Sequence, residues 1–210
     1  MDKSSTKPKG ATSYKKTAFG IISRFKLLKL ELEGTKKGLE YLEGLFAKEK
    51  NVEITPKLIT KLHAVSFGWV FPDWAGKFRT VQVTFSNKEA LLYYKLPELM
   101  LNLCHDTEKR MKHLPKPTTQ NFIFEVVSLL AWFQHRFVYI HPFKDYNGRT
   151  ARMLTILLLL RLGLPPLELK ADTREDREQY LAAMQNADVG NYSLLEKLIS
   201  QALPESFEKI

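Results

Sequence analysis

Two strongly apolar segments on either side of a short polar one constrain the fold more than any other feature of the sequence. They span residues 122–140 and 153–160, and residues 141–152 join them. The first segment contains the polar or charged side chains of Glu125, Gln134, His135 and Arg136, among others. The second is too short to cross a bilayer core of about 30 Å. We therefore expect two buried helices joined by a polar loop, and no membrane segment.

Length and composition favour one compact domain. The chain has 210 residues, of which 44% are hydrophobic, enough to form a core. Its single cysteine, Cys104, excludes an internal disulfide framework and suits a reducing compartment. The first 17 residues hold no apolar block, so we expect no signal peptide and a cytoplasmic location.

The net charge of +9 is concentrated partly at the N-terminus. Residues 1–17 carry five lysines and one aspartate among Ser, Thr, Pro and Gly, which is typical of a mobile basic tail. No zinc-ligand spacing, helix-turn-helix pattern or RNA-binding aromatic motif accompanies this charge. Nucleic acid is therefore an unlikely partner, and a solvated tail is the simpler interpretation.

Apolar spacing predicts a helical bundle with one small hairpin. A first apolar helical face comprises Ile21, Ile22, Phe25, Leu28 and Leu32, with Gly34 and Gly38 weakening the helix beyond it. Candidate first residues or caps of later helices are Pro56, Pro97, Thr118 or Thr119, Asn147, Asp172 or Thr173, and Ser193. Residues 81–85 alternate apolar and polar, which predicts a strand in a short hairpin. The expected fold is all-α with that hairpin.

The polar segment combines the groups that bind a polyphosphate. Its sequence is HPFKDYNGRTAR, residues 141–152. A helix beginning near Asn147 leaves backbone N–H groups unpaired, and Gly148 lets an anion approach them. Arg149 and Arg152 lie one helical turn apart, so both guanidinium groups would face the same anion.

Two further side chains of this segment suggest chemistry on that anion. Asp145 precedes the helix, where its carboxylate would hold a Mg²⁺ that bridges phosphates. His141 precedes Pro142, which favours an extended backbone at the histidine. The imidazole would then take a proton from an attacking hydroxyl.

This segment resembles the Fic family signature, His-Pro-Phe-x-(Asp/Glu)-Gly-Asn-Gly-Arg-x-x-Arg, and departs from it only at Tyr146. The resemblance extends over about residues 55–205, and residues 76–85 resemble the family's "flap" hairpin. It implies a Fic domain at 53–210, preceded by a helical segment at 18–52 and the tail at 1–17. The implied activity is transfer of AMP from Mg-ATP to a Tyr, Thr or Ser hydroxyl of a target protein.

The resemblance also implies residue roles. His141 would be the general base, Asp145 would bind Mg²⁺, and Arg152 would orient the γ-phosphate of ATP. Asn147, Gly148 and Arg149 would hold the phosphates. The strand residues Val81 and Val83 would either register the target segment or merely cover the site.

Tyr146 stands where the family usually has glycine. A side chain there is tolerated if the backbone keeps a negative φ and the ring points outward. Otherwise we expect weaker nucleotide binding or a different nucleotide.

Regulation and several single residues remain open in the sequence. Many Fic proteins carry an inhibitory glutamate, and Glu33 is a candidate to reach Arg152, while an antitoxin-like partner protein is the other possibility. Tyr180 would stack on a nucleotide base or pack in the core. His135 is expected to be structural and Cys104 a core residue. The remaining histidines, His63, His105 and His113, show no metal-ligand spacing and receive no role.

Other functions keep the same fold. Transfer of UMP, phosphate or phosphocholine occurs in the Fic/Doc superfamily, and a non-catalytic module of a toxin–antitoxin pair is a different class. The intact motif from Asn147 to Arg152 favours AMP transfer among them.

Overall fold

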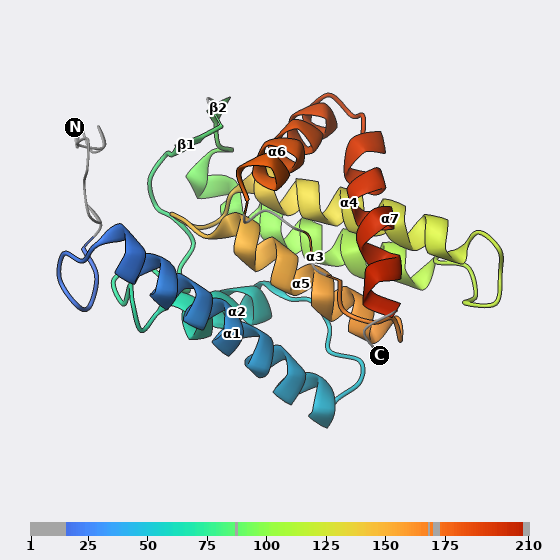
Figure 1. The fold of residues 1–210 in the computed structure, drawn as a ribbon, viewed down its shortest axis with the longest axis horizontal. Coiled ribbons are helices and arrows are strands. Elements are labelled where there is room, and N and C mark those ends of the chain that lie inside the picture. The colour runs from blue at the N-terminus through green and yellow to red at the C-terminus, as the bar shows by residue number, and fades with distance from the viewer. Residues whose placement is uncertain (1–15, 87, 168, 170–172, 208–210) are drawn as a thin grey trace.

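The computed structural model describes residues 16–86, 88–167, 169 and 173–207, so most of the predicted tail at 1–17 lies outside the described residues. The chain is mostly helical with one two-stranded sheet (Figure 1). The helices are α1 Arg24–Lys48, α2 Pro56–Phe67, the 3₁₀ turn η1 Tyr93–Lys95, α3 Leu96–Lys112, α4 Phe122–Ile140, α5 Asn147–Arg161, α6 Arg174–Asp188 and α7 Ser193–Phe207. The strands are β1 Thr84–Phe85 and β2 Lys88–Glu89. The predicted all-α fold with one small hairpin is confirmed.

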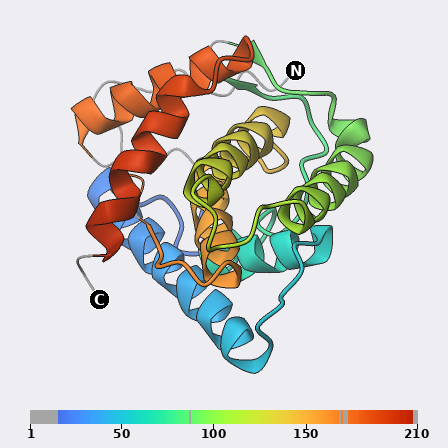
Figure 2. The ribbon, with the colours of Figure 1, turned by 90° about the vertical axis from the view of Figure 1, so that its right-hand side faces the viewer.

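Helices α4 and α5 form the centre of the molecule, as the apolar segments predicted. Helix α4 packs against α3, α5, α6 and α7, and α5 also packs against α1 and α2. In Figure 2 the other helices surround this central pair. Although α4 is long and apolar enough to cross a membrane by length and composition, more than half of its residues are buried in the domain.

The first helix packs with a different face from the one that its apolar spacing predicted. Its buried residues are Leu27, Glu31, Gly34, Gly38 and Leu42. The predicted face is largely exposed, at Ile21, Phe25, Leu28 and Leu32.

Helix α1 runs without a break through Gly34 and Gly38, and both glycines allow α2 and α5 to approach it. A Cβ atom on Gly34 would lie 2.3 Å from the Ser66 carbonyl oxygen, and one on Gly38 would lie 2.5 Å from Met153 Sδ. A side chain at position 34 would clash with backbone, and one at position 38 would displace the side chains of Ser66 and Met153. The two glycines therefore determine which face of α1 is buried.

The hairpin is shorter than predicted. Thr84 pairs with Glu89 and Phe85 with Lys88, but Val81 and Val83 lie outside the strands. One backbone hydrogen bond extends beyond the strands, from the Ala90 N–H to the Val83 carbonyl at 3.0 Å. The Val81 carbonyl accepts instead from the Arg79 side chain, also at 3.0 Å.

Helix caps agree with the sequence in part. Thr173 accepts a hydrogen bond from a backbone N–H of the first turn of α6, as expected. Helix α2 begins at the predicted Pro56, and Thr55, which the sequence did not single out, caps it in the same way. Helix α4 is preceded by Asn121 rather than Thr118 or Thr119. Helix α5 is capped by Tyr146, and Asn147 is its first residue rather than its cap.

Candidate active site

The loop between α4 and α5 begins and ends with a non-glycine residue in the left-handed backbone region. His141 has φ 54° and Tyr146 has φ 60°. The extended backbone predicted for His141 is therefore wrong. This conformation costs roughly 1–2 kcal/mol for a residue with a side chain, so the surrounding contacts must hold both residues in it.

The imidazole of His141 is fixed in one tautomer. Its Nδ1 lies 3.2 Å from the Val138 carbonyl oxygen, which can only accept, so Nδ1 carries the proton and Nε2 has the lone pair. The ring of Phe85 in β1 stacks on it, with centroids 4.0 Å apart. Burial lowers the pKa of His141 to about 4, aided by the charges of Arg79 and Lys88 and opposed by the Val138 hydrogen bond. At neutral pH this imidazole is a neutral acceptor.

Arg79 connects the hairpin region to the His141 loop through hydrogen bonds. Its Nε donates to the His141 carbonyl oxygen at 2.8 Å, and its backbone N–H donates to the Pro142 carbonyl at 2.9 Å. Another guanidinium nitrogen donates to the Leu91 carbonyl. The side chain is 2% exposed, so these carbonyl acceptors replace its hydration.

His63 supports the middle of the same loop from α2. Its Nδ1 accepts from the Gly76 N–H at 2.9 Å, so Nε2 carries the proton and donates to the Asp145 carbonyl at 3.1 Å. Its ring stacks on Phe143, with centroids 3.8 Å apart. Burial lowers the pKa of His63 to about 3. The sequence assigned no role to His63 and did not single out Arg79, because neither lies near the motif in the chain.

The side chain of Asn147 holds the loop closed. Its Oδ1 accepts from the Phe143 N–H and its Nδ2 donates to the Phe143 carbonyl, both at 2.9 Å. Its carboxamide is therefore already paired, and an anion would meet the backbone of this residue rather than its side chain.

The start of α5 gathers unpaired backbone donors. The first helical hydrogen bond runs from Thr150 N to the Tyr146 carbonyl at 2.9 Å. Within the described part of the chain, the N–H groups of residues 147–149 have no such partner, as expected for a helix start. Asp145 lies just before them, and its Oδ1 accepts from the Tyr146 N–H at 2.8 Å.

Tyr146 meets neither of the two conditions stated for a side chain at this position, a negative φ and a ring that points outward. Its φ is positive, and its ring points inward and is 6% exposed. The ring stacks on Phe67 of α2 with centroids 4.3 Å apart. Its hydroxyl donates to Glu31 Oε1 of α1 at 2.8 Å. The side chain therefore turns away from the N–H groups at the start of α5 and packs into the core.

The glutamate that reaches the motif is Glu31, not Glu33. Glu31 Oε2 lies 3.0 Å from Arg149 Nη2, and Glu31 is 4% exposed. Glu33 is exposed and pairs with Lys37 on the same helix. The hypothesis that Glu33 contacts Arg152 is wrong, because the two glutamates lie on different faces of α1.

Arg152 lies beside Tyr180 of α6, its guanidinium carbon 5.9 Å from the ring centroid. Tyr180 is 7% exposed, and its hydroxyl accepts from Gln134 Nε2 at 2.7 Å. Core packing, one of the two alternatives for Tyr180, is therefore its role in this structure.

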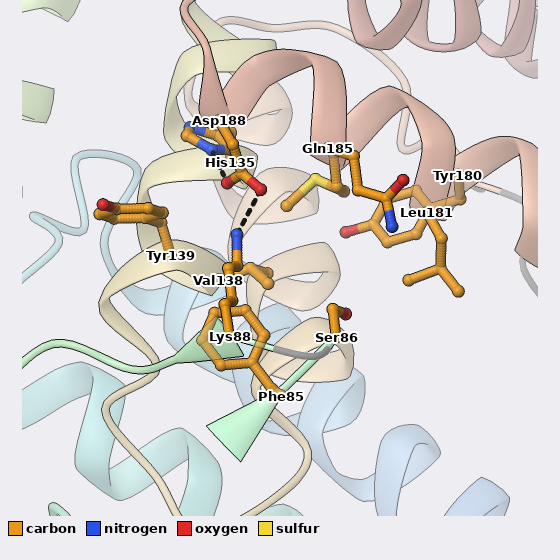
Figure 3. Close-up of a pocket in the computed structure, with 11 residues that line it drawn as sticks. Phe85, Ser86, Lys88, His135, Val138, Tyr139, Tyr180, Leu181, Gln185 and Asp188 are labelled. Carbon is orange, nitrogen blue, oxygen red and sulfur yellow. Dashed lines mark hydrogen bonds and ion pairs between the residues drawn. The ribbon is translucent and has the colours of Figure 1, made fainter. Parts of the chain in front are cut away.

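A small cavity of about 40 Å³ lies between the hairpin, α4 and α6, close to both Phe85 and Tyr180 (Figure 3). Lys88 of β2 and Asp188 of α6 form an ion pair across it. His135 Nε2 lies 3.0 Å from Asp188 Oδ1, so this histidine serves the ion pair, in agreement with a structural role. The cavity is well below the volume of about 300–1,000 Å³ usual for ligand pockets. A nucleotide base would enter only if the hairpin moved away from α6.

A neutral histidine that can accept a proton at Nε2, a helix start with unpaired N–H groups and two nearby arginines define a domain suited to chemistry on a phosphate anion. The model of the Fic/DOC family matches residues 53–159, and the chain belongs to this family.

Relatives and solved structures support the same assignment. The chain is 30% identical to "Protein adenylyltransferase Fic" of Nematostella vectensis over 76% of its own length and 35% of that protein. It is 30% identical to the protein of that name from Aedes aegypti, over 76% of this chain and 30% of that one. The chain thus spans about a third of the length of these relatives.

Among solved structures, Fic-1 (residues 134–508) from Caenorhabditis elegans superposes with a TM-score of 0.70 at 26% identity. That match covers 85% of this chain and 49% of the other. The BepC protein of Bartonella tribocorum with bound AMPPNP has a TM-score of 0.66 at 17% identity, over 91% of this chain and 93% of that one. The second likeness concerns the fold alone.

Proposed function

We propose that this domain is a protein adenylyltransferase that transfers AMP from Mg-ATP to a Tyr, Thr or Ser hydroxyl of a target protein. The observation that carries the proposal is the state of His141: a neutral imidazole whose Nδ1 proton is held by Val138, leaving Nε2 to accept a proton. The motif that begins with it ends in a helix start with unpaired donors. The names of the relatives support the same activity.

In the proposed reaction, Nε2 of His141 takes the proton of the target hydroxyl as the hydroxyl oxygen attacks the α-phosphorus of ATP. The new O–P bond forms while the bond from the α-phosphorus to the bridging oxygen breaks, and pyrophosphate leaves. Positioning and charge neutralisation supply most of the catalysis in such transfers.

The phosphates would lie at the start of α5. The N–H groups of Asn147, Gly148 and Arg149 would donate to them, and the guanidinium groups of Arg149 and Arg152 would balance their charge. The open space beside Gly148 suits this, since a Cβ there would meet only Arg152 Nη1, at 3.6 Å.

Asp145 would contribute the protein's carboxylate to Mg²⁺. Among the residues that the structure describes, no three His, Cys, Asp or Glu side chains cluster as a metal site. This fits an ion that enters with the nucleotide, because Mg²⁺ commonly takes one or two carboxylates and completes its shell with phosphate and water. Such an ion would neutralise charge on the phosphates.

The hairpin region would present the target. Val81 is exposed, and we propose that its N–H group and that of Val83 donate to an extended target segment, since their carbonyls already accept from Arg79 and Ala90. After the hairpin moves away from α6, the adenine would lie between these two elements, near Tyr180. The bound AMPPNP of BepC supports a nucleotide site in this fold.

Labelling with α-³²P-ATP and Mg²⁺ in a cell lysate tests the proposal. The wild type should label a protein band, and His141→Ala should reduce the labelling rate by about 10²–10⁴-fold, as for loss of a general base. His105→Ala is the matched control, since His105 is exposed at 76%. Equal labelling by the wild type and His141→Ala would refute the proposed role of His141.

Mass spectrometry of the labelled protein separates the related reactions. AMP, UMP, phosphate and phosphocholine add different masses, and only an AMP adduct agrees with the proposal. A folded wild type that binds no nucleotide would instead favour a non-catalytic toxin–antitoxin module. An inhibitory antitoxin-like partner, the absence of nucleic-acid and membrane partners, and a cytoplasmic location stay predictions.

A further inference from the structure

A charged side chain of α1 lies buried against the phosphate-binding motif. Glu31 is 4% exposed on the helix face that packs against α2 and α5. A carboxylate in such a place is stable only when donors and positive charge compensate for its lost hydration. The hydrogen-bond and ion-pair partners of Glu31 therefore indicate how it acts on the motif.

The two carboxylate oxygens of Glu31 contact two residues of the motif. Oε1 accepts from the Tyr146 hydroxyl at 2.8 Å, and Oε2 lies 3.0 Å from Arg149 Nη2. The Arg149 guanidinium carbon also lies 5.4 Å from the centroid of the Tyr146 ring. Arg149 is thus held from two sides, by a carboxylate and by an aromatic face. Arg24, itself 61% exposed, comes within 3.9 Å of Oε1 and adds a weaker positive charge.

Tyr146 also holds the start of α5. Its carbonyl accepts from the Thr150 N–H at 2.9 Å and from the Thr150 hydroxyl at 3.0 Å, which begins the helix. Its left-handed backbone carries a conformational cost, and the buried ring stacked on Phe67 offsets that cost. The residue that departs from the family pattern therefore connects the core to the helix start.

We propose that Tyr146 and Glu31 are positioning residues that orient Arg149 toward phosphates bound at the start of α5. The inference rests on the proposed function. Glu31 engages Arg149 through the terminal Nη2, and a guanidinium group has five N–H donors in a planar fork, so donors remain for a phosphate oxygen. A pre-oriented arginine loses less conformational entropy when the nucleotide binds.

An inhibitory role for Glu31 would change nucleotide affinity in the opposite direction. If Glu31 competed with phosphate for Arg149, removing its charge would tighten nucleotide binding. If Tyr146 and Glu31 only stabilised the fold, their loss would affect every ligand alike.

Binding of two probes to the full chain distinguishes these cases. We would measure dissociation constants for Mg-ATP by calorimetry and for adenosine by NMR titration, in the wild type, Tyr146→Phe and Glu31→Gln. Both substitutions keep side-chain volume, and melting temperatures establish that each variant is folded. The matched controls on α1 are Tyr41→Phe and Glu33→Gln, since Tyr41 is half-buried and Glu33 is exposed.

We expect Glu31→Gln to weaken Mg-ATP binding about tenfold and Tyr146→Phe to weaken it about threefold, with adenosine binding changed less than about twofold. The controls should match the wild type for both probes. Tighter Mg-ATP binding by Glu31→Gln, no change in either variant, or equal weakening for both probes would overturn the inference. If the wild type binds adenosine and Mg-ATP equally poorly, the proposed function fails, and this inference fails with it.

Discussion

At the scale of single residues, the site depends on side chains whose ionisation and orientation are controlled by burial. His141 is neutral because it is buried beside two cations, and its proton lies on Nδ1 because Val138 offers only an acceptor. Tyr146 points inward because the core offers it a stacking partner and a carboxylate. The residues that surround these two side chains lie far from the motif in the sequence. Val138, three residues before His141, is the exception.

The lowered pKa of His141 predicts that the proposed transfer continues at acidic pH for as long as the protein stays folded. A general base must be neutral, so kcat/KM should stay high as the pH falls and decline only near pH 4, the pKa to which burial and nearby cations lower this group. Lys88→Gln removes one of those cations, so protonation becomes easier and the acidic limb should move to higher pH. The profile of kcat/KM against pH for labelling measures this. Lys48→Gln, at the end of α1 far from the hairpin in Figure 1, should leave the limb in place. A downward shift in Lys88→Gln would contradict the argument.

Replacing Tyr146 by the glycine usual in the family should destabilise this protein. The left-handed backbone becomes easier by roughly 1 kcal/mol, but the loss of a buried aromatic ring costs about 3–5 kcal/mol. We therefore expect Tyr146→Gly to lower the free energy of unfolding by about 2–4 kcal/mol, as measured by urea denaturation. Tyr94→Ala, at a position 64% exposed, should change it by less than about 0.5 kcal/mol. An unchanged stability in Tyr146→Gly would show that the ring contributes little.

At the scale of elements, the hairpin region connects three parts of the site. Arg79 ties it to the His141 carbonyl, Phe85 covers the His141 ring, and Lys88 reaches Asp188 of α6. The alternating pattern at residues 81–85 predicted the hairpin but overstated the strand. Side-chain donors from Arg79 and Gln82 occupy carbonyls that a longer ladder would use.

Backbone pairing by the hairpin region predicts a separation of target modification from nucleotide binding. Proline at both Val81 and Val83 removes their N–H groups, so labelling of the target should fall at least about tenfold while the affinity for Mg-ATP stays within about twofold. The double replacement by threonine keeps both N–H groups and the branched shape, and it should retain labelling. Radiolabel transfer and calorimetry measure the two quantities. If proline reduced both equally, the hairpin would have only a structural role.

At the scale of the whole molecule, the central helices place the motif where distant segments converge. Helix α2 contributes His63, α1 contributes Glu31, and the segment before the hairpin contributes Arg79. The family match at 53–159 ends within α5 and does not include α1, α6 or α7. These flanking helices nevertheless pack directly against α4 or α5.

The buried His63 predicts acid sensitivity of the whole fold. Its pKa is about 3 in the folded protein and 6.5 in the unfolded chain. Above pH 6.5 both states are neutral at this residue. As the pH falls from 6.5 toward 3, only the unfolded state takes up the proton, so the free energy of unfolding falls by up to about 1.4 kcal/mol per pH unit.

His63→Gln keeps a donor and an acceptor but does not titrate, so its stability should fall less steeply with acid than that of the wild type. Urea denaturation between pH 7 and pH 4 measures both slopes. His135 and His141, whose pKa values are also lowered, contribute equally to both proteins. If the stability of the two proteins fell with pH at the same slope, His63 would take up a proton in the folded state as easily as in the unfolded one. The prediction would then be wrong.

The sequence by itself determined the features that depend on near neighbours in the chain. The apolar segments predicted α4 and α5, Pro56 and Thr173 marked helix starts, and twelve consecutive residues carried the motif. Helical period, capping and a contiguous loop are local properties, so they can be read without knowing how the elements pack. The positions of His141 and of the start of α5 in the candidate site were predictable for this reason.

Only the tertiary structure decided which distant residues support that site. His63 contacts Asp145 across 82 residues of sequence, and Tyr146 contacts Glu31 across 115. The apolar stripe of α1 predicted the wrong buried face, because the close approach at Gly34 and Gly38 turned Glu31 inward instead. Side-chain orientation depends on the shape and charge of the surface that the helix meets, and that surface exists only when the chain is folded.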